Sequence, residues 1–104
     1  MEQQINPVFL DTIYGEKPSL IQFSAEWCGP CKILSPLIDD INDNFYEQLN
    51  VLRVDVDRNQ AIAAHYSISS VPTLMIFKNG EIIWHHVGLI TPVELIKTIK
   101  GIIE

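Results

Sequence analysis

Apolar residues recur along this chain with two different spacings, and each spacing predicts a different kind of element. Four short segments rich in apolar and β-forming residues are typical of strands, and they are Ser19–Ser24, Val51–Val56, Thr73–Lys78 and Glu81–Val87. The remaining segments show helical spacing or helix-capping residues, and they span 6–15, 28–45, 59–66 and a last stretch from Thr91. The predicted order is therefore α-β-α-β-α-β-β-α.

Turn and cap residues support these boundaries. Asn6 followed by Pro7 is a favourable helix start, because Asn caps free N–H groups and Pro fits the first helical position. The run Thr91–Glu94 is a capping box before the last helix. The Asn79-Gly80 pair between two strands predicts a tight hairpin.

The order of elements predicts an α/β fold. The first two strands flank the long helix over 28–45, which favours a parallel β-α-β unit. The last two strands are joined by the tight turn and therefore run antiparallel. We predict one domain over residues 1–104, with a central mixed β-sheet flanked by helices on both faces.

Composition and charge exclude several classes of function. Apolar residues make up 47% of the 104 residues, and the formal net charge is −6 with seven Lys and Arg residues, so we expect binding neither to nucleic acid nor to a membrane. The longest apolar runs are about four residues, against the roughly 20 of a membrane-spanning helix. No basic residue precedes Lys17 and no apolar segment follows Met1, so we expect no leader and a cytoplasmic protein.

The candidate chemistry lies in the segment WCGPCK, residues 27–32, where a predicted strand ends and a helix begins. A cysteine at a helix N-terminus lies beside unpaired N–H groups and the positive end of the helix dipole. Both favour the thiolate over the thiol. Cys28 is therefore the candidate nucleophile.

The second cysteine, Cys31, shares a helix face with Cys28, and Cβ atoms at this spacing are roughly 5–6 Å apart. A disulfide needs Cβ atoms about 4 Å apart, so a small adjustment of the first turn closes the gap. Gly29 and Pro30 suit such a turn. The pair therefore predicts thiol–disulfide exchange, in which Cys28 attacks a target disulfide and Cys31 resolves the mixed disulfide.

Two other interpretations of the pair are a metal site and an inert structural pair. A zinc site needs four ligands, and no second C-x-x-C is present. The histidines (His65, His85 and His86) lie far from the motif in sequence, so we expect no metal.

The motif WCGPCK is the active-site sequence of the thioredoxin family, which the chain resembles from about Val8 to Ile103. Further matching blocks are Phe23–Glu26, Pro36, Val54–Asp57, Val71–Thr73, Phe77–Gly80 and Val87-Gly88. The resemblance implies the thioredoxin fold and a protein-disulfide reductase without a cofactor beyond its redox-active disulfide. It also implies protein disulfides as targets and a thioredoxin reductase as electron donor, and we expect a monomer. Only Met1–Ile5 precede the first helix, so we expect the family's N-terminal edge strand to be short or absent.

The resemblance also implies a docking surface around the reactive sulfur. Pro72 matches a cis-proline that lies against the disulfide in the family, where it would turn the Val71 backbone toward a target segment that pairs as an added strand. The residues of this docking surface would be Trp27, Gly29, Pro30, Val71, Pro72 and Gly88.

The chain departs from the family below the motif. Gln22 stands where most members have a buried aspartate, which the family associates with proton transfer to and from the second cysteine. Glutamine forms hydrogen bonds but does not titrate. Arg53 stands where a lysine is usual, and we expect it to remain charged. We interpret Gln22, Arg53 and Lys32 as tuning residues, the last by favouring the thiolate. We expect the adjacent Asp39 and Asp40 on a solvated helix face.

Two alternative functions stay open. The first is an oxidase, an isomerase or an exported reductase of different redox poise. The Gly29-Pro30 pair resembles the reducing branch of the family, whereas Gln22 leaves the poise open. The second is a protein-binding module in which the cysteines have little redox role.

Overall fold

The predicted elements are all present in the computed structural model, which describes residues 6–104. The helices are α1 (Pro7–Ile13), α2 (Gly29–Phe45), α3 (Gln60–His65) and α4 (Pro92–Ile103). The strands are β1 (Ser19–Ser24), β2 (Asn50–Asp55), β3 (Thr73–Lys78) and β4 (Glu81–Val87). Observed and predicted boundaries differ by at most two residues. The expectation about an N-terminal edge strand falls on Met1–Ile5, outside the described residues.

The predicted caps and hairpin are confirmed. The Asn6 side chain accepts a 2.8 Å hydrogen bond from the N–H of Val8, and Thr91 Oγ1 accepts one of 3.2 Å from the N–H of Glu94. At the hairpin, Asn79 and Gly80 both have positive φ, 53° and 81°, as the tight turn requires.

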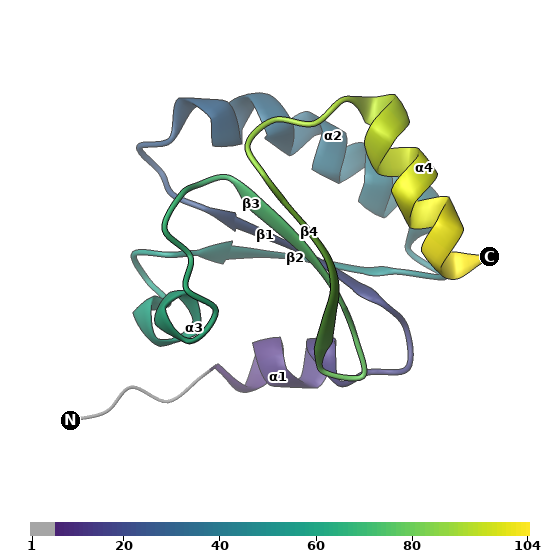
Figure 1. Ribbon diagram of the computed structural model, residues 1–104, viewed down its shortest axis with the longest axis horizontal. Coiled ribbons are helices and arrows are strands. Elements are labelled where there is room, and N and C mark those ends of the chain that lie inside the picture. Colours follow the sequence, from purple (N-terminus) through teal and green to yellow (C-terminus); the bar gives the residue numbers. More distant parts are fainter. Residues whose placement is uncertain (1–5) are drawn as a thin grey trace.

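The sheet has four strands in the order β2-β1-β3-β4 and is mixed, as predicted. Strand β1 pairs with β2 in parallel and with β3 in antiparallel, and β3 pairs with β4 in antiparallel. The central strands β1 and β3 are buried on both faces, which explains why their sequences are almost continuously apolar. Figure 1 shows α2 and α4 on one face of the sheet and α1 and α3 on the other.

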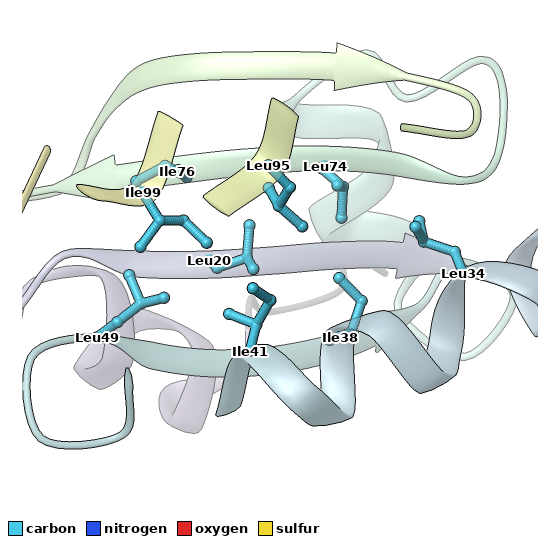
Figure 2. Packing of buried hydrophobic residues seen from close by; sticks show 9 residues of the cluster. All are labelled: Leu20, Leu34, Ile38, Ile41, Leu49, Leu74, Ile76, Leu95 and Ile99. Carbon is cyan, nitrogen blue, oxygen red and sulfur yellow. The ribbon is translucent and has the colours of Figure 1, made fainter. Parts of the chain in front are cut away.

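The larger core lies between the sheet and the α2–α4 pair. Figure 2 shows Leu20 of β1 between Ile38 and Ile41 of α2 and the side chains of Leu95 and Ile99 of α4. Each of these side chains is essentially inaccessible to solvent. Burying one Leu or Ile stabilises a fold by about 1.5–3 kcal/mol, so this layer holds α2 firmly against the sheet.

The opposite face carries an aromatic cluster. Phe9 of α1 packs edge-on against Phe77 of β3, and Tyr66, just after α3, packs against both rings. Phe23 of β1 completes the cluster from the sheet. The two cores hold β1 and α2 in place, and thereby fix the junction between the carboxyl end of β1 and the start of α2. The cysteine motif lies at this junction.

No helix within residues 6–104 has both the length and the apolar character needed to cross a membrane.

Candidate functional site: a disulfide at the start of α2

The two cysteines form a disulfide across the first turn of α2, with their Cα atoms 5.3 Å apart. Cys28 is the N-cap residue of the helix, and Cys31 lies within its first turn. Each cysteine is only 3% exposed. The expected position of the pair, at the junction of a strand and a helix, is therefore confirmed.

The sulfur of Cys28 occupies the place of a capping oxygen. The backbone N–H of Cys31 donates a 3.1 Å hydrogen bond to Cys28 Sγ. When the disulfide opens, this N–H and the positive end of a helix that continues to Phe45 both face the sulfur. Both interactions stabilise a negative charge, so the geometry favours the thiolate at Cys28.

Trp27 presents its ring to solvent beside the disulfide and is 71% exposed. Its orientation is fixed by a 2.9 Å hydrogen bond from Nε1 to Asp57 Oδ2, after the end of β2. Nothing in the spacing of the sequence pointed to Asp57 as a partner of Trp27. Gly29 and Pro30 follow in the exposed first turn of α2.

The segment before β3 reaches the same place. The Val71–Pro72 peptide bond is cis, as the family resemblance implies. Val71 packs against the buried cluster that contains both cysteines. Trp27 and Val71 line one surface hollow of about 320 Å³, with Val56 and residues 68–70 completing it.

Gly88 joins the site from the end of β4. Its N–H donates a 2.8 Å hydrogen bond to the carbonyl oxygen of Pro72, and its φ is +93°. Of the predicted docking residues, Val71 packs against the cluster of the two cysteines, Trp27 shares the hollow with Val71, and Gly88 is hydrogen-bonded to Pro72.

Gln22 of β1 is completely buried. Its Oε1 accepts a 3.0 Å hydrogen bond from Arg53 Nε. Among the described residues its Nε2 has no hydrogen-bond partner. The amide therefore has one orientation imposed by Arg53, with two unused donors directed away from the guanidinium.

Arg53 is held on its other side by α2. Its Nη2 donates to the carbonyl oxygen of Ser35 at 2.9 Å and to Asp39 Oδ1 at 2.7 Å. Asp39 is 63% exposed on α2, as expected of a solvated helix face, and its ion pair with Arg53 is an addition that the sequence did not predict. Asp40 is exposed as expected.

Lys32 extends from the surface of α2 directly after Cys31. No hydrogen bond or ion pair of its ammonium group is present within residues 6–104. Nor do three or more His, Cys, Asp or Glu side chains gather anywhere in that range in a way that would hold a metal ion.

Comparison with known proteins identifies the same family along nearly the whole chain. The thioredoxin family profile matches residues 3–101. A thioredoxin of Pyropia yezoensis is 39% identical over 94 residues, which is 90% of this chain and 88% of that protein. Thioredoxin 1 of Synechococcus elongatus is 40% identical over 82 residues, covering 79% of this chain and 77% of the relative.

A solved structure agrees with this result. A mutant thioredoxin from Halobacterium salinarum NRC-1 is 34% identical, and it superposes with a TM-score of 0.85 over 96% of this chain and 88% of its own. The fold of that protein is the mixed sheet with helices on both faces described above. The disulfide at the start of α2 corresponds to the family's C-x-x-C chemistry. This chain therefore belongs to the thioredoxin family.

Proposed function

We propose that Cys28 is the attacking thiolate, and Cys31 the resolving thiol, of the protein-disulfide reduction that this family of proteins performs. The observation that carries these roles is the hydrogen bond from the N–H of Cys31 to the sulfur of Cys28 at the N-terminus of α2. That N–H and the helix dipole stabilise charge on Cys28, the N-cap, more than on Cys31, which lies inside the turn.

The reaction balances because two thiols and one disulfide are consumed and one disulfide and two thiols are formed. The Cys28 thiolate attacks one sulfur of the target, and the other target sulfur leaves with the electron pair of the broken bond. Cys31 then releases its proton and attacks Cys28, so the Cys28–Cys31 disulfide forms and the second target sulfur departs. The target gains two electrons and two protons, and the chain becomes oxidised. No metal or organic cofactor takes part in this exchange.

The docking surface proposed for the target comprises Trp27, Gly29, Pro30, Val71, Pro72 and Gly88, and the contacts of Val71, Trp27 and the Gly88–Pro72 pair support it. The exposed ring of Trp27 and the hollow beside it offer apolar contact. A target segment in extended form would pair with the backbone near Val71, so main-chain hydrogen bonds would bind many different sequences.

Because Gln22 stands where most members of the family have a buried aspartate, this position carries no titrating side chain. Its amide neither accepts nor releases a proton near neutral pH, so the proton of Cys31 passes to water or to the leaving thiolate. Gln22, Arg53 and Lys32 then tune the field around the sulfurs without carrying the proton. Arg53 supplies a fixed charge, since a guanidinium stays protonated.

The physiological setting proposed here follows the family. Protein disulfides are the targets, and a thioredoxin reductase restores the dithiol with two electrons. We propose a monomer of one domain over residues 1–104 that works in the cytoplasm. The family acts on protein disulfides in general, and the individual targets are determined by the docking surface.

The test is reduction of insulin with dithiothreitol as the electron source. Wild type should accelerate insulin reduction and Cys28→Ser should leave only the rate of dithiothreitol alone. Equal rates with wild type and Cys28→Ser would remove the enzyme interpretation and favour a binding module. A measured redox potential well above that of a reducing thioredoxin would favour the oxidase or isomerase alternative.

A further inference from the structure

On the surface of α2, Asp39 forms an ion pair with Arg53. Arg53 also contacts Ser35, which is hydrogen-bonded to Cys31. We propose that Asp39 is a positioning residue for the resolving step: by holding and partly neutralising Arg53, it limits how strongly that cation favours the Cys31 thiolate. The proposal rests on the role of Cys31 proposed above.

The Arg53 side chain is fixed at three points. It comes from β2 and donates to Gln22 Oε1, to the Ser35 carbonyl oxygen and to Asp39 Oδ1, at 3.0, 2.9 and 2.7 Å. Two of these partners belong to α2 and one to β1, so the guanidinium is clamped between the sheet and the helix. Loss of the Asp39 charge would leave the other two contacts in place.

The clamp is connected to the resolving cysteine through Ser35. Ser35 is the residue one turn after Cys31, about 6 Å along the helix axis at 1.5 Å per residue. The two residues are also joined directly, because Ser35 Oγ donates a 3.1 Å hydrogen bond to the carbonyl oxygen of Cys31. The Arg53 guanidinium, which contacts both Ser35 and Asp39, is therefore about one to two helical turns along α2 from the Cys31 position.

The inner contact of the cation, Gln22, and the resolving cysteine are both buried. Gln22 is 0% exposed and Cys31 is 3% exposed, so the field of the guanidinium reaches the sulfur with less screening than it would in solvent. The outer side of the Arg53–Asp39 ion pair is exposed to solvent, since the side chain of Arg53 is 42% and that of Asp39 63% exposed. The ion pair itself is therefore worth little to stability, and its larger effect is on the charge felt inside.

Other charges around Cys31 do not change when Asp39 is altered. Lys32 lies beside it on α2, Asp57 is bound to Trp27, and Glu26 and Arg58 form an exposed ion pair at 2.9 Å. No titrating group lies below Cys31 at the Gln22 position. Asp39 is thus the acidic partner of the one cation clamped between β1, β2 and α2 in the described structure.

The test compares Asp39→Asn with Asp40→Asn. Both substitutions remove one negative charge from adjacent residues of the same helix, but only Asp39 contacts Arg53. Asparagine keeps an oxygen that accepts the Arg53 hydrogen bond, so the clamp survives while the charge is lost. A difference between the two variants therefore reports the specific pair and not the net charge.

The resolving step is measured in stopped flow with the aromatic disulfide dithiobisnitrobenzoate. The dithiol protein releases a first thionitrobenzoate when Cys28 attacks, and a second when Cys31 displaces it from Cys28. We expect Asp39→Asn to raise the rate of the second release at neutral pH about threefold and to move its pH profile to lower pH. Asp40→Asn should change the rate less than half as much.

A double-mutant cycle tests whether the effect of Asp39→Asn acts through Arg53. In an Arg53→Gln background, Asp39→Asn should have no further effect on the second release, since the cation through which it acts is gone. Equal effects of Asp39→Asn and Asp40→Asn, or an undiminished effect without Arg53, would overturn the proposal. If wild type itself shows no second release, the proposed role of Cys31 fails instead, and the two failures are thereby distinguished.

Discussion

The N–H of Gly88 donates a 2.8 Å hydrogen bond to the carbonyl oxygen of Pro72, and this single contact joins the end of β4 to the segment before β3. The segment before β3 reaches the disulfide through Val71, which packs against the cluster that contains both cysteines. The backbone of Gly88 has a φ of +93°, a conformation that residues with a Cβ rarely adopt. A target segment that pairs beside Val71 therefore meets a loop whose shape only glycine holds without strain.

The first prediction concerns Gly88→Ala. Space is not limiting, because no atom lies within 4 Å of the position that a Cβ would take, so the cost is backbone strain of about 1–2 kcal/mol. We expect kcat/KM for insulin to fall several-fold, while the reaction with dithiobisnitrobenzoate, which needs little docking, stays near wild type. Urea unfolding measures the strain. An unchanged rate with insulin would show that the loop takes no part in docking.

Much of this fold could be predicted from the sequence, because local signals and tertiary packing agree. Asn6, Thr91 and the Asn79-Gly80 pair each have a mechanism that acts within a few residues, and each forms the predicted cap or turn. The buried strands β1 and β3 were recognisable from continuous apolar runs. The position of Cys28 at a helix N-terminus followed from the same boundaries.

The contacts of long polar side chains could not be predicted. Asp39 lies on a solvated helix face, as expected, but its ion pair with Arg53 was not predicted, because it depends on the register of β1 on β2, which places Arg53 opposite Gln22. The hydrogen bond between Trp27 and Asp57 likewise joins residues that no local pattern relates. Such pairs depend on strand register and on how α2 crosses the sheet, and both are tertiary properties.

The second prediction assigns the two cysteines by trapping. Cys31→Ser retains the attacking sulfur but lacks the resolving one, so it should accumulate covalent complexes with target proteins. Cys28→Ser should accumulate far fewer, because Cys31 lacks the N-cap position that stabilises the thiolate. Non-reducing gels of both variants, incubated with oxidised insulin, measure this difference. More abundant complexes with Cys28→Ser would reverse the assigned roles.

The third prediction concerns Gln22→Asp, which introduces a titrating group below Cys31. Burial raises the pKa of such a carboxyl, and Arg53 opposes that rise. Above its pKa the carboxylate accepts the Cys31 proton, so the second release of thionitrobenzoate should accelerate as pH increases from 6 to 9, relative to wild type. Gln22→Asn serves as the control for the shorter side chain. If the two variants show the same pH profile, the missing acid has no kinetic importance.

The fourth prediction uses the tyrosine of the aromatic cluster. Burial, followed by the nearby Tyr14, raises the pKa of Tyr66 above its ordinary value of 10.0. The unfolded chain therefore loses this proton at lower pH than the folded chain, and stability should fall as pH increases above about 10. Tyr66→Phe should weaken this alkaline loss, whereas Tyr46→Phe, at an exposed position, should retain it. Urea unfolding at pH 8 and 10.5 compares the three proteins, and identical alkaline losses in all three would contradict the assignment.

The last prediction separates stability from redox chemistry. Gly101 lies inside α4, and no neighbouring atom lies within 4 Å of the position that a Cβ would take there. Its φ is not positive. Alanine there reduces the freedom of the unfolded chain and suits the helix, so Gly101→Ala should increase the free energy of unfolding by about 0.5–1 kcal/mol. Its insulin reduction rate should equal that of wild type, because α4 packs on the sheet through Leu95 and Ile99, away from the disulfide. A stabilised protein with a changed rate would mean that the α2–α4 layer transmits strain to the first turn of α2.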